Sequence, residues 1–188
     1  MDTEKKIGLK KSKAIMLFIQ MFLILFLLVI SIYLLVFVIS NHLGGWMITS
    51  YIFIIISVVA IICYSIIGFK KGKIAYLLSI CPFLAAIFVN VLLPNREIFQ
   101  VAMLTVLFAL TFAFILKQED KKFTYLVGIL MVAVSLIFSI YSAIKANTQF
   151  LGDVSTNWPT YVAMYTSIFV PVIMSGTFAL TYNVRVTK

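Results

Sequence analysis

Very few residues in this 188-residue chain could carry out chemistry, and they lie far apart in the sequence. The single histidine, His42, and the carboxylates of Glu97 and Asp153 fall in three different connections between apolar segments. Together they could collect around a metal ion or a lipid headgroup, but no motif joins them. A zinc protease needs ligands such as those of a His-Glu-x-x-His helix, and a nucleophile needs a base beside it. The sequence therefore predicts a protein that is not an enzyme, with no catalytic residue, cofactor or metal.

The two cysteines are the other residues with possible chemistry. Cys63 lies near the end of one apolar segment and Cys81 near the start of the next. At 1.5 Å per helical residue, both would sit ~10 Å below the same membrane surface. A redox pair or a soft-metal site is one interpretation. The favoured interpretation is that both cysteines are reduced thiols that serve as small packing residues, because a reducing compartment disfavours a disulfide.

A third group of residues could contact a solute or a neighbouring helix. Asn90 is a strong uncharged polar group within an apolar segment, and an asparagine there either bonds another helix or binds a solute. Pro82 and Pro171 interrupt the third and the sixth segment, and each proline removes a backbone donor. Ser167 and Ser175 lie with Pro171 in a row of small residues at four-residue spacing, which is typical of close helix packing. The candidate contact residues are therefore Asn90, Pro82, Ser167, Pro171 and Ser175.

These residues must be positioned by membrane-spanning helices. The chain is 63% hydrophobic and 11% charged, whereas a soluble domain has ~25% charged residues. A bilayer core takes ~20 helical residues to cross, and helices are expected because lipid offers no partner for an open backbone. The sequence predicts an all-α membrane bundle, one domain over residues 1–188, with six transmembrane helices. The predicted spans are about 14–40, 47–69, 74–93, 98–116, 124–144 and 161–182.

The basic residues predict the orientation. Thirteen of the fifteen Lys and Arg side chains precede the first span, follow the last one or lie in the second and fourth loops, while the other loops hold only Arg96 and Lys145. Positive charge marks cytoplasmic loops, so both termini are expected in the cytoplasm. This placement accounts for the net charge of +9 without nucleic acid as a partner. The bias towards Lys, Ile and Phe favours a bacterial, multi-pass protein of the cell membrane.

An internal repeat is possible. Six spans divide into two halves of three, and an odd number of spans in each half would invert one half relative to the other. Pro82 and Pro171 interrupt the third span of each half, and matched interrupted helices are the best sequence indication of a midplane transport site. The alternative is that the two prolines are unrelated, because proline is common in membrane helices.

Two functions from different classes are compatible with this pattern. The leading hypothesis is a non-enzymatic membrane protein that contacts a membrane-protein partner through its helices, as an accessory subunit of a transport or secretion system or as an immunity-type protein. The nearly unbroken aliphatic first span suggests it. The alternative is a component that binds or facilitates passage of a small neutral or aromatic solute, with a site between the third and sixth helices. A well-filled bundle would favour the first hypothesis, and a polar cavity would favour the second.

The size and the six-span plan are similar to those of the substrate-binding subunits of vitamin-uptake energy-coupling transporters. The resemblance implies a solute-binding bundle that docks on a coupling subunit. In that family the first helix carries regularly spaced alanines where the coupling subunit docks. Here Ala14 stands alone at the start of the first span, which puts that docking in doubt.

Overall fold

The computed structural model describes residues 2–42, 44–67, 72–93, 97–116, 120–149 and 154–185, although the side chains of 2–13, 16, 17, 64–67, 72–77, 121, 147–149, 154–158 and 181–185 are outside the description. Over these ranges the chain is all-helical and contains no strand. The helices are α1 (Asp2–Ser40), α2 (Gly45–Ile67), α3 (Gly72–Val91), α4 (Ile98–Leu116), α5 (Lys121–Gln149) and α6 (Val154–Arg185). The predicted all-α class is confirmed.

Five helices are long and apolar enough to cross a membrane, judged over the residues whose side chains are described. These candidate spans are Phe18–Ser40, Gly45–Cys63, Ile98–Leu116, Lys122–Ala146 and Pro159–Leu180. In α3 the described apolar stretch, Leu78–Val91, is shorter, although the helix has 20 residues in all. The chain is a helical membrane bundle, and the passage of α3 across the full bilayer stays a prediction.

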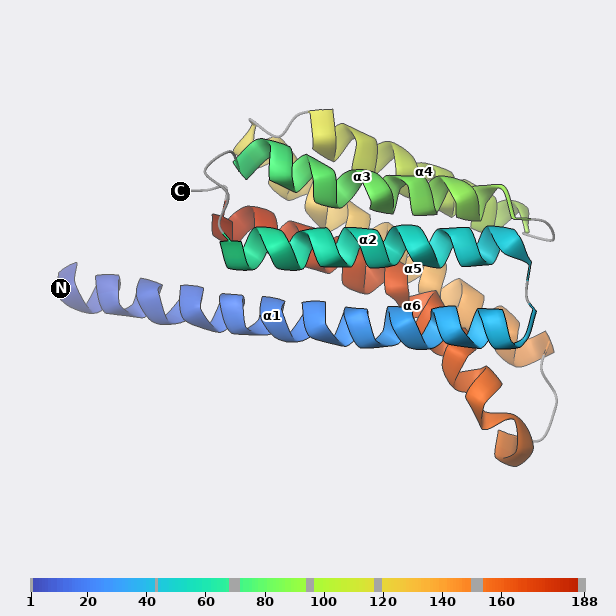
Figure 1. Ribbon diagram of the computed structural model, residues 1–188. Helices are drawn as coiled ribbons and strands as arrows, with labels where there is room; N and C mark the ends of the chain where they lie inside the picture. The colour runs from blue at the N-terminus through green and yellow to red at the C-terminus, as the bar shows by residue number, and fades with distance from the viewer. Residues whose placement is uncertain are drawn as a thin grey trace.

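The helices form a ring in chain order. The six most extensive packing interfaces join each helix to the next one and join α6 back to α1. Neighbouring helices run in opposite directions, so α1 begins and α6 ends on the same side of the bundle (Figure 1). We call this the terminal side, and the opposite side, which holds the α1–α2 turn, the distal side. α6 crosses the bundle obliquely, and α1 projects beyond the other helices on the terminal side (Figure 1).

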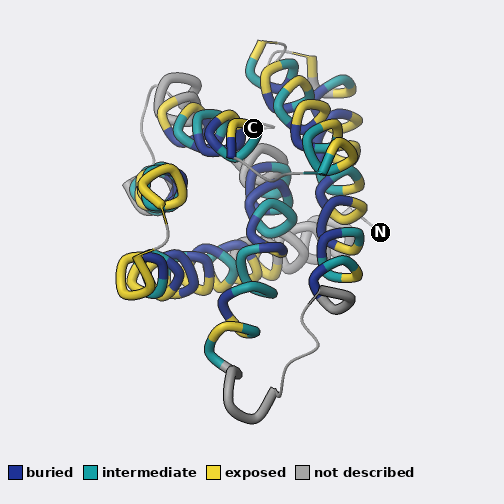
Figure 2. Tube along the Cα trace, turned by 90° about the vertical axis from the view of Figure 1, so that its right-hand side faces the viewer, coloured by how far each residue is buried: buried dark blue, intermediate teal, exposed yellow. Residues whose placement is uncertain are grey.

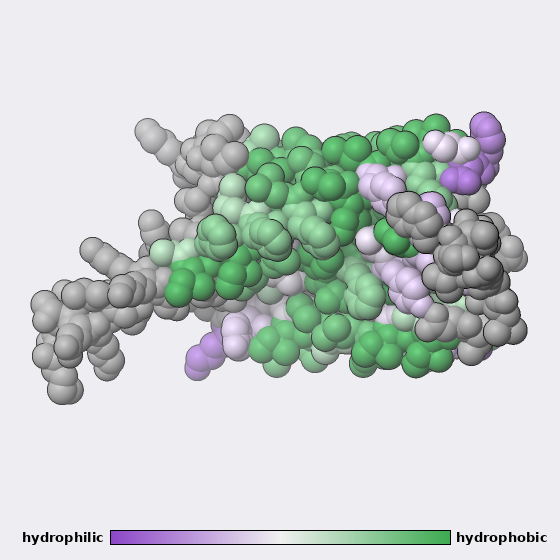
Figure 3. All heavy atoms as spheres, turned by 90° about the horizontal axis from the view of Figure 1, so that it is seen from below, coloured by the Kyte–Doolittle hydropathy of each residue, from purple (hydrophilic) through white to green (hydrophobic). Residues whose placement is uncertain are grey.

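The buried and exposed faces are those expected of a protein surrounded by lipid. Exposed positions lie on the outer sides of most helices and buried positions towards the centre (Figure 2). The centre holds many hydroxyl groups, among them Ser57, Ser135 and Thr111, while Phe and Ile side chains are exposed. On the face shown in Figure 3 hydrophobic residues cover the middle and strongly hydrophilic ones lie only towards the two ends. Small polar residues in the centre allow close helix contact, as in membrane bundles generally.

Several helix limits differ from the predicted spans. α1 begins at Asp2, before the predicted start of the first span at about residue 14. Its 39 residues measure about 58 Å at 1.5 Å per residue. α5 continues to Gln149 and α6 begins at Val154, so the predicted connection over 145–160 is mostly helical. Hydropathy marks the length buried in lipid, whereas the helices continue into the headgroup region. The first helix also belongs to the ring, because it packs against α2 and α6 and its Leu27 and Leu34 side chains are buried.

A close approach of α5 and α6 at Gly128 gives a first testable prediction. A Cβ atom at Gly128 would meet the Cβ of Ala179 at 3.3 Å, whereas one at Gly176 would meet nothing within 4 Å. We expect Gly128→Val to lower stability by ~1–3 kcal/mol through overpacking. Gly176→Ala should leave stability unchanged or raise it by up to ~1 kcal/mol through helix propensity. Thermal unfolding in detergent measures both, and equal effects of the two substitutions would contradict the packing.

Candidate functional site

A cavity in the distal half of the bundle is the best-formed site among the described residues. Its volume is about 360 Å³ and all six helices contribute to its wall. Most of the wall is apolar or aromatic, including Phe37, Phe83 and Phe138. No charged residue lines it. Its polar lining residues are Ser50, Tyr51, Asn90, Ser142, Thr160 and Ser167.

The depth of the cavity follows from the helix directions. Its wall uses the last turns of α1, from Leu34 to Val38, and the first turns of α2, from Met47 to Ile54. It also uses α3 beyond Pro82 and α6 as far as Pro171. The space is about twelve times the ~30 Å³ that one water occupies in the liquid, and it lies within the ~300–1,000 Å³ of small-molecule pockets. An apolar wall with a few placed polar groups is the usual chemistry of such pockets.

Asn90 bonds another helix, as one interpretation of its sequence position predicted, and solute binding by it stays a prediction. Its Nδ2 atom donates to Ser50 Oγ on α2 at 2.5 Å and to the carbonyl oxygen of Ala86, one turn earlier, at 2.8 Å. The side chain thereby ties α3 to α2 and also lines the cavity. These hydrogen bonds fix the orientation of the partly buried carboxamide in a wall that is mostly apolar.

The structure brings together three of the five candidate contact residues. Asn90, Ser167 and Pro171 line the distal cavity, whereas Pro82 and Ser175 do not. Ser175 shares a hydrogen bond of 3.1 Å with Ser135 of α5. The site is therefore wider than the expected contact between the third and sixth helices, because α1, α2, α4 and α5 also form its wall.

Four polar wall residues were not identified from the sequence. Ser50 and Tyr51 lie on α2, Ser142 on α5 and Thr160 on α6, and they belong to no common motif. All four fall near the distal ends of their helices, so antiparallel spans of similar length would place them at one depth. Which face of each helix they occupy depends on packing that a single sequence does not show.

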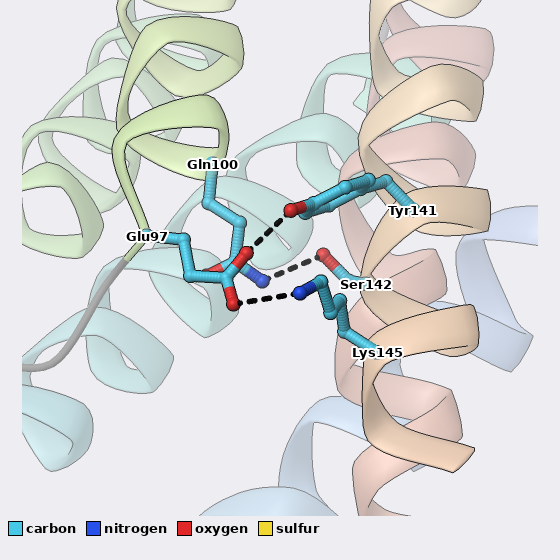
Figure 4. A network of polar contacts seen from close by, with 5 residues as sticks. All are labelled: Glu97, Gln100, Tyr141, Ser142 and Lys145. Atoms are coloured by element: carbon cyan, nitrogen blue, oxygen red, sulfur yellow. Dashed lines mark hydrogen bonds and ion pairs between the residues drawn. The ribbon is translucent and has the colours of Figure 1, made fainter. Parts of the chain in front are cut away.

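A cluster of polar side chains joins α4 to α5 at the distal side (Figure 4). Lys145 Nζ lies 3.2 Å from Glu97 Oε1, and the Tyr141 hydroxyl donates to Glu97 Oε2. One turn away, Gln100 Nε2 donates to Ser142 Oγ at 3.2 Å. Because Ser142 also lines the cavity, the cluster lies directly behind one part of the cavity wall.

The cluster holds Glu97 in its charged form. The hydrogen bond from Tyr141 lowers the pKa of the Glu97 carboxyl below its ordinary value, and the hydrogen bond from Lys145 lowers it further. Desolvation acts in the opposite direction but is the smaller effect. The Lys145 and Glu97 side chains are 42% and 39% exposed, so solvent screens the pair and its contribution to stability is small.

The lowered pKa predicts a pH dependence. A carboxyl whose pKa is lower in the folded state stabilises the fold above its ordinary pKa of ~4.3, and this contribution is lost as the pH falls through the lowered folded value. We expect Glu97→Gln to melt at a slightly lower temperature than the wild type at pH 7. The difference should shrink below about pH 4, as measured by thermal unfolding of both proteins. A difference that grows on acidification would contradict the pairing.

The remaining chemical candidates do not assemble in the described part of the chain. Glu97 is engaged by Tyr141 and Lys145, His42 is exposed in the α1–α2 turn with φ of 51°, and Asp153 is outside the described residues. No group of three His, Cys, Asp or Glu side chains within the described ranges could hold a metal ion. Cys63 and Cys81 are free thiols, and Cys81 is exposed rather than buried as expected.

Other hydroxyl groups form hydrogen bonds to helix backbones. Tyr33 donates to the carbonyl of Pro159 at 3.3 Å and joins α1 to α6. Thr166 and Thr177 donate to carbonyls of their own helix. These three lie outside the cavity wall, and the side chain of Tyr64 is not described.

The fold and the cavity define a class, a polytopic helical membrane protein with a pocket in one half of the bundle that no charged residue lines. Comparison of the chain with protein-family models, curated proteins and solved structures gave no match. Its function is therefore inferred from geometry and chemistry.

Proposed function

We propose that this chain is a non-enzymatic membrane protein that binds a small neutral solute in the distal cavity, as a component of solute transport. The observation that carries the proposal is the cavity of about 360 Å³, whose wall is formed by all six helices. A bundle that acted only through its outer surface would gain nothing from such a space, because an unfilled void loses packing contacts.

The lining indicates the chemistry of the solute. No charged side chain faces the cavity, and a charge buried without a partner is strongly disfavoured. The aromatic walls of Phe37, Phe83 and Phe138 suit a flat or apolar body. Asn90, Ser50 and Ser167 suit one polar edge. We therefore expect a neutral molecule, aromatic or compactly apolar, with a few hydrogen-bonding atoms.

Matched pairs of probes test this proposal. Purified protein in detergent is heated with benzamide, indole or thymine, and separately with charged analogues of similar shape such as benzoate. The neutral probes should raise the melting temperature, while the charged ones should not, because the cavity offers no opposite charge. Equal responses within each pair, or no response to any neutral probe, would contradict the proposal.

The orientation is part of the proposal. The basic loops support cytoplasmic termini in a bacterial cell membrane, which would place the distal cavity in the outer half of the bilayer. We expect reporter domains fused to either end to be active only as cytoplasmic reporters. A reporter inserted in the α1–α2 turn should behave as external, and an external signal from either terminus would reverse the assignment.

Contact with a membrane-protein partner is a second candidate function, and one surface favours it. α1 exposes large apolar residues at alternating spacings of four and three, beginning with Phe18, Phe22, Leu25 and Val29. Such spacing suits a left-handed helix pair. Purification in mild detergent should then recover a stoichiometric partner that is lost when Phe22 and Val29 are replaced by alanine. Repeated recovery of the monomer alone would favour the lipid as the neighbour of this surface.

A further inference from the structure

Each half of the bundle contains the same unusual contact. In the first half, Ser57 of α2 donates its hydroxyl hydrogen to the carbonyl oxygen of Ser79, three residues before Pro82. In the second half, Ser139 of α5 donates to the carbonyl oxygen of Ile168 at 2.7 Å, three residues before Pro171. In both halves the donor lies on the second helix and is fully buried.

The contact has a physical cause. A proline within a helix lacks the N–H that the carbonyl four residues earlier would use, and its ring pushes that turn open. Carbonyls in the opened turn can then accept a hydrogen bond from outside the helix, and in lipid a neighbouring helix must supply it. Pro82 is the eleventh of the 20 residues of α3. Pro171 is the thirteenth of the 22 residues in its candidate span, so both opened turns lie near mid-membrane.

The serines and prolines align the two halves. When Ser57 is aligned with Ser139, the sequence of α2 is aligned with that of α5. When Pro82 is aligned with Pro171, the sequence of α3 is aligned with that of α6. Because each half contains three antiparallel helices, the second half is inverted relative to the first (Figure 1). The alignment therefore assigns to each position in the distal half a counterpart in the terminal half.

A second cavity lies where this alignment places it. A groove of about 350 Å³ on the terminal side is lined by the end of α4, the start of α5 and Ala179 of α6. The alignment places the four α2 residues of the distal cavity on four α5 residues that all line this groove. Met47, Ser50, Tyr51 and Ile54 fall on Ile129, Val132, Ala133 and Leu136. Likewise, Asn90 of α3 falls on Ala179 of α6. For α2 and α5 both the depth and the helix face agree. For α3 and α6 the match is limited to Asn90, because Phe83, Ala86 and Ile87 of the distal cavity fall on α6 residues that do not line the groove.

The two cavities differ in their lining, and the difference indicates a direction of solute movement. The polar contacts at Ser50 and Asn90 correspond to apolar Val132 and Ala179. All six helices line the distal cavity, while three helices line the terminal groove. Between them, the rings of Phe83 and Phe178 pack with centroids 5.3 Å apart. Phe83 lines the distal cavity, Phe178 precedes Ala179 of the groove, and both rings are buried.

We infer that α1–α3 and α4–α6 form an inverted structural repeat with equivalent hinges at Ser57–Pro82 and Ser139–Pro171, and that the bound solute passes from the distal cavity to the terminal side. The inference rests on the proposed solute binding and adds movement to it. Bending at the hinges separates Phe83 from Phe178, and rocking of one repeat against the other then exposes the site on the terminal side, as inverted repeats permit.

Accessibility of one cysteine from each side tests the inference. Cys63 and Cys81 are first replaced by serine, and Ser50→Cys is then introduced in the distal cavity. A small neutral reagent, hydroxyethyl methanethiosulfonate, is added to sealed right-side-out vesicles and, separately, to inside-out vesicles. Glutathione enclosed in the vesicle lumen destroys any reagent that crosses the membrane, so each preparation reports access from one side. We expect modification of Ser50→Cys from both sides. Val58→Cys is the matched control, because Val58 is buried on the same helix but does not line the cavity. It should react from neither side.

A second variant probes the ring pair. Phe178→Ala should raise the rate of modification of Ser50→Cys from the terminal side by about tenfold, because it removes a packed aromatic pair. Modification from the distal side alone, with and without Phe178→Ala, would overturn the inference and leave solute binding intact. Reaction from neither side would also overturn it. Thermal stabilisation of the same variants by benzamide shows separately whether the binding proposal survives.

Discussion

Replacing Ser167 with phenylalanine is expected to abolish solute binding while the bundle stays folded. Ser167 lines the distal cavity on α6 and is only partly buried, so a phenyl ring can enter the space without displacing backbone. The serine hydroxyl donates to the Met164 carbonyl of its own helix. The substitution therefore fills the site at little cost to the fold.

The expected effect is large. A solute at 100 times its Kd stabilises the folded protein by ~2.7 kcal/mol, which corresponds to roughly 5–10 °C in melting temperature for a chain of this size. That shift should be present in the wild type and absent in Ser167→Phe. Val162→Phe is the matched control, because Val162 lies on the same helix with an exposed side chain and should keep the full shift. Loss of the shift in both variants would indicate a general effect of added bulk.

The second large effect is expected at Asn90. Asn90→Leu keeps the approximate size of the side chain but removes the carboxamide from the cavity wall. A buried polar group of the solute left without its partner costs ~1–3 kcal/mol, so the affinity should fall by about 5- to 150-fold. Titration with the best neutral probe of the benzamide series measures this change.

Two controls separate binding from packing at Asn90. Ser50→Ala removes the hydrogen bond between α3 and α2 and leaves the carboxamide in place, so it should reduce stability more than affinity. Asn41→Leu alters an exposed asparagine at the end of α1, whose amide donates to the Phe37 carbonyl of its own helix. It should leave affinity unchanged. An Asn90→Leu protein with wild-type affinity would show that the carboxamide serves only the fold.

The helical bundle was predictable because hydropathy reports directly on lipid burial. The run Ile98–Leu116 matches its helix at both ends, since apolar residues begin and end there together. Hydropathy did not predict the helix limits where a helix continues beyond the apolar segment. α1 starts at Asp2, and α6 begins before Pro159, because polar helical turns continue beyond the hydrocarbon.

The cavity was only partly predictable. Asn90 and Pro171 stand out as polar or backbone-altering residues in apolar segments, and both line it. Ser50 and Thr160 carry no such signal, because a serine or threonine in a membrane helix usually satisfies its own backbone, as Thr105 does. The ion pair between Glu97 and Lys145 was likewise not predictable from the sequence. It joins the residue before α4 to a residue of α5 that lies beyond the predicted end of the fifth span at about residue 144.

The most direct test of the distal cavity as a solute site needs no prior guess about the solute. Wild-type protein, Ser167→Phe and Val162→Phe are purified from their membranes, denatured, and analysed by mass spectrometry for the small molecules released. The wild type and Val162→Phe should release the same neutral compound in near-stoichiometric amount, and Ser167→Phe should release none. Identical release from all three proteins, or release of nothing but phospholipid from the wild type, would contradict solute binding in the cavity.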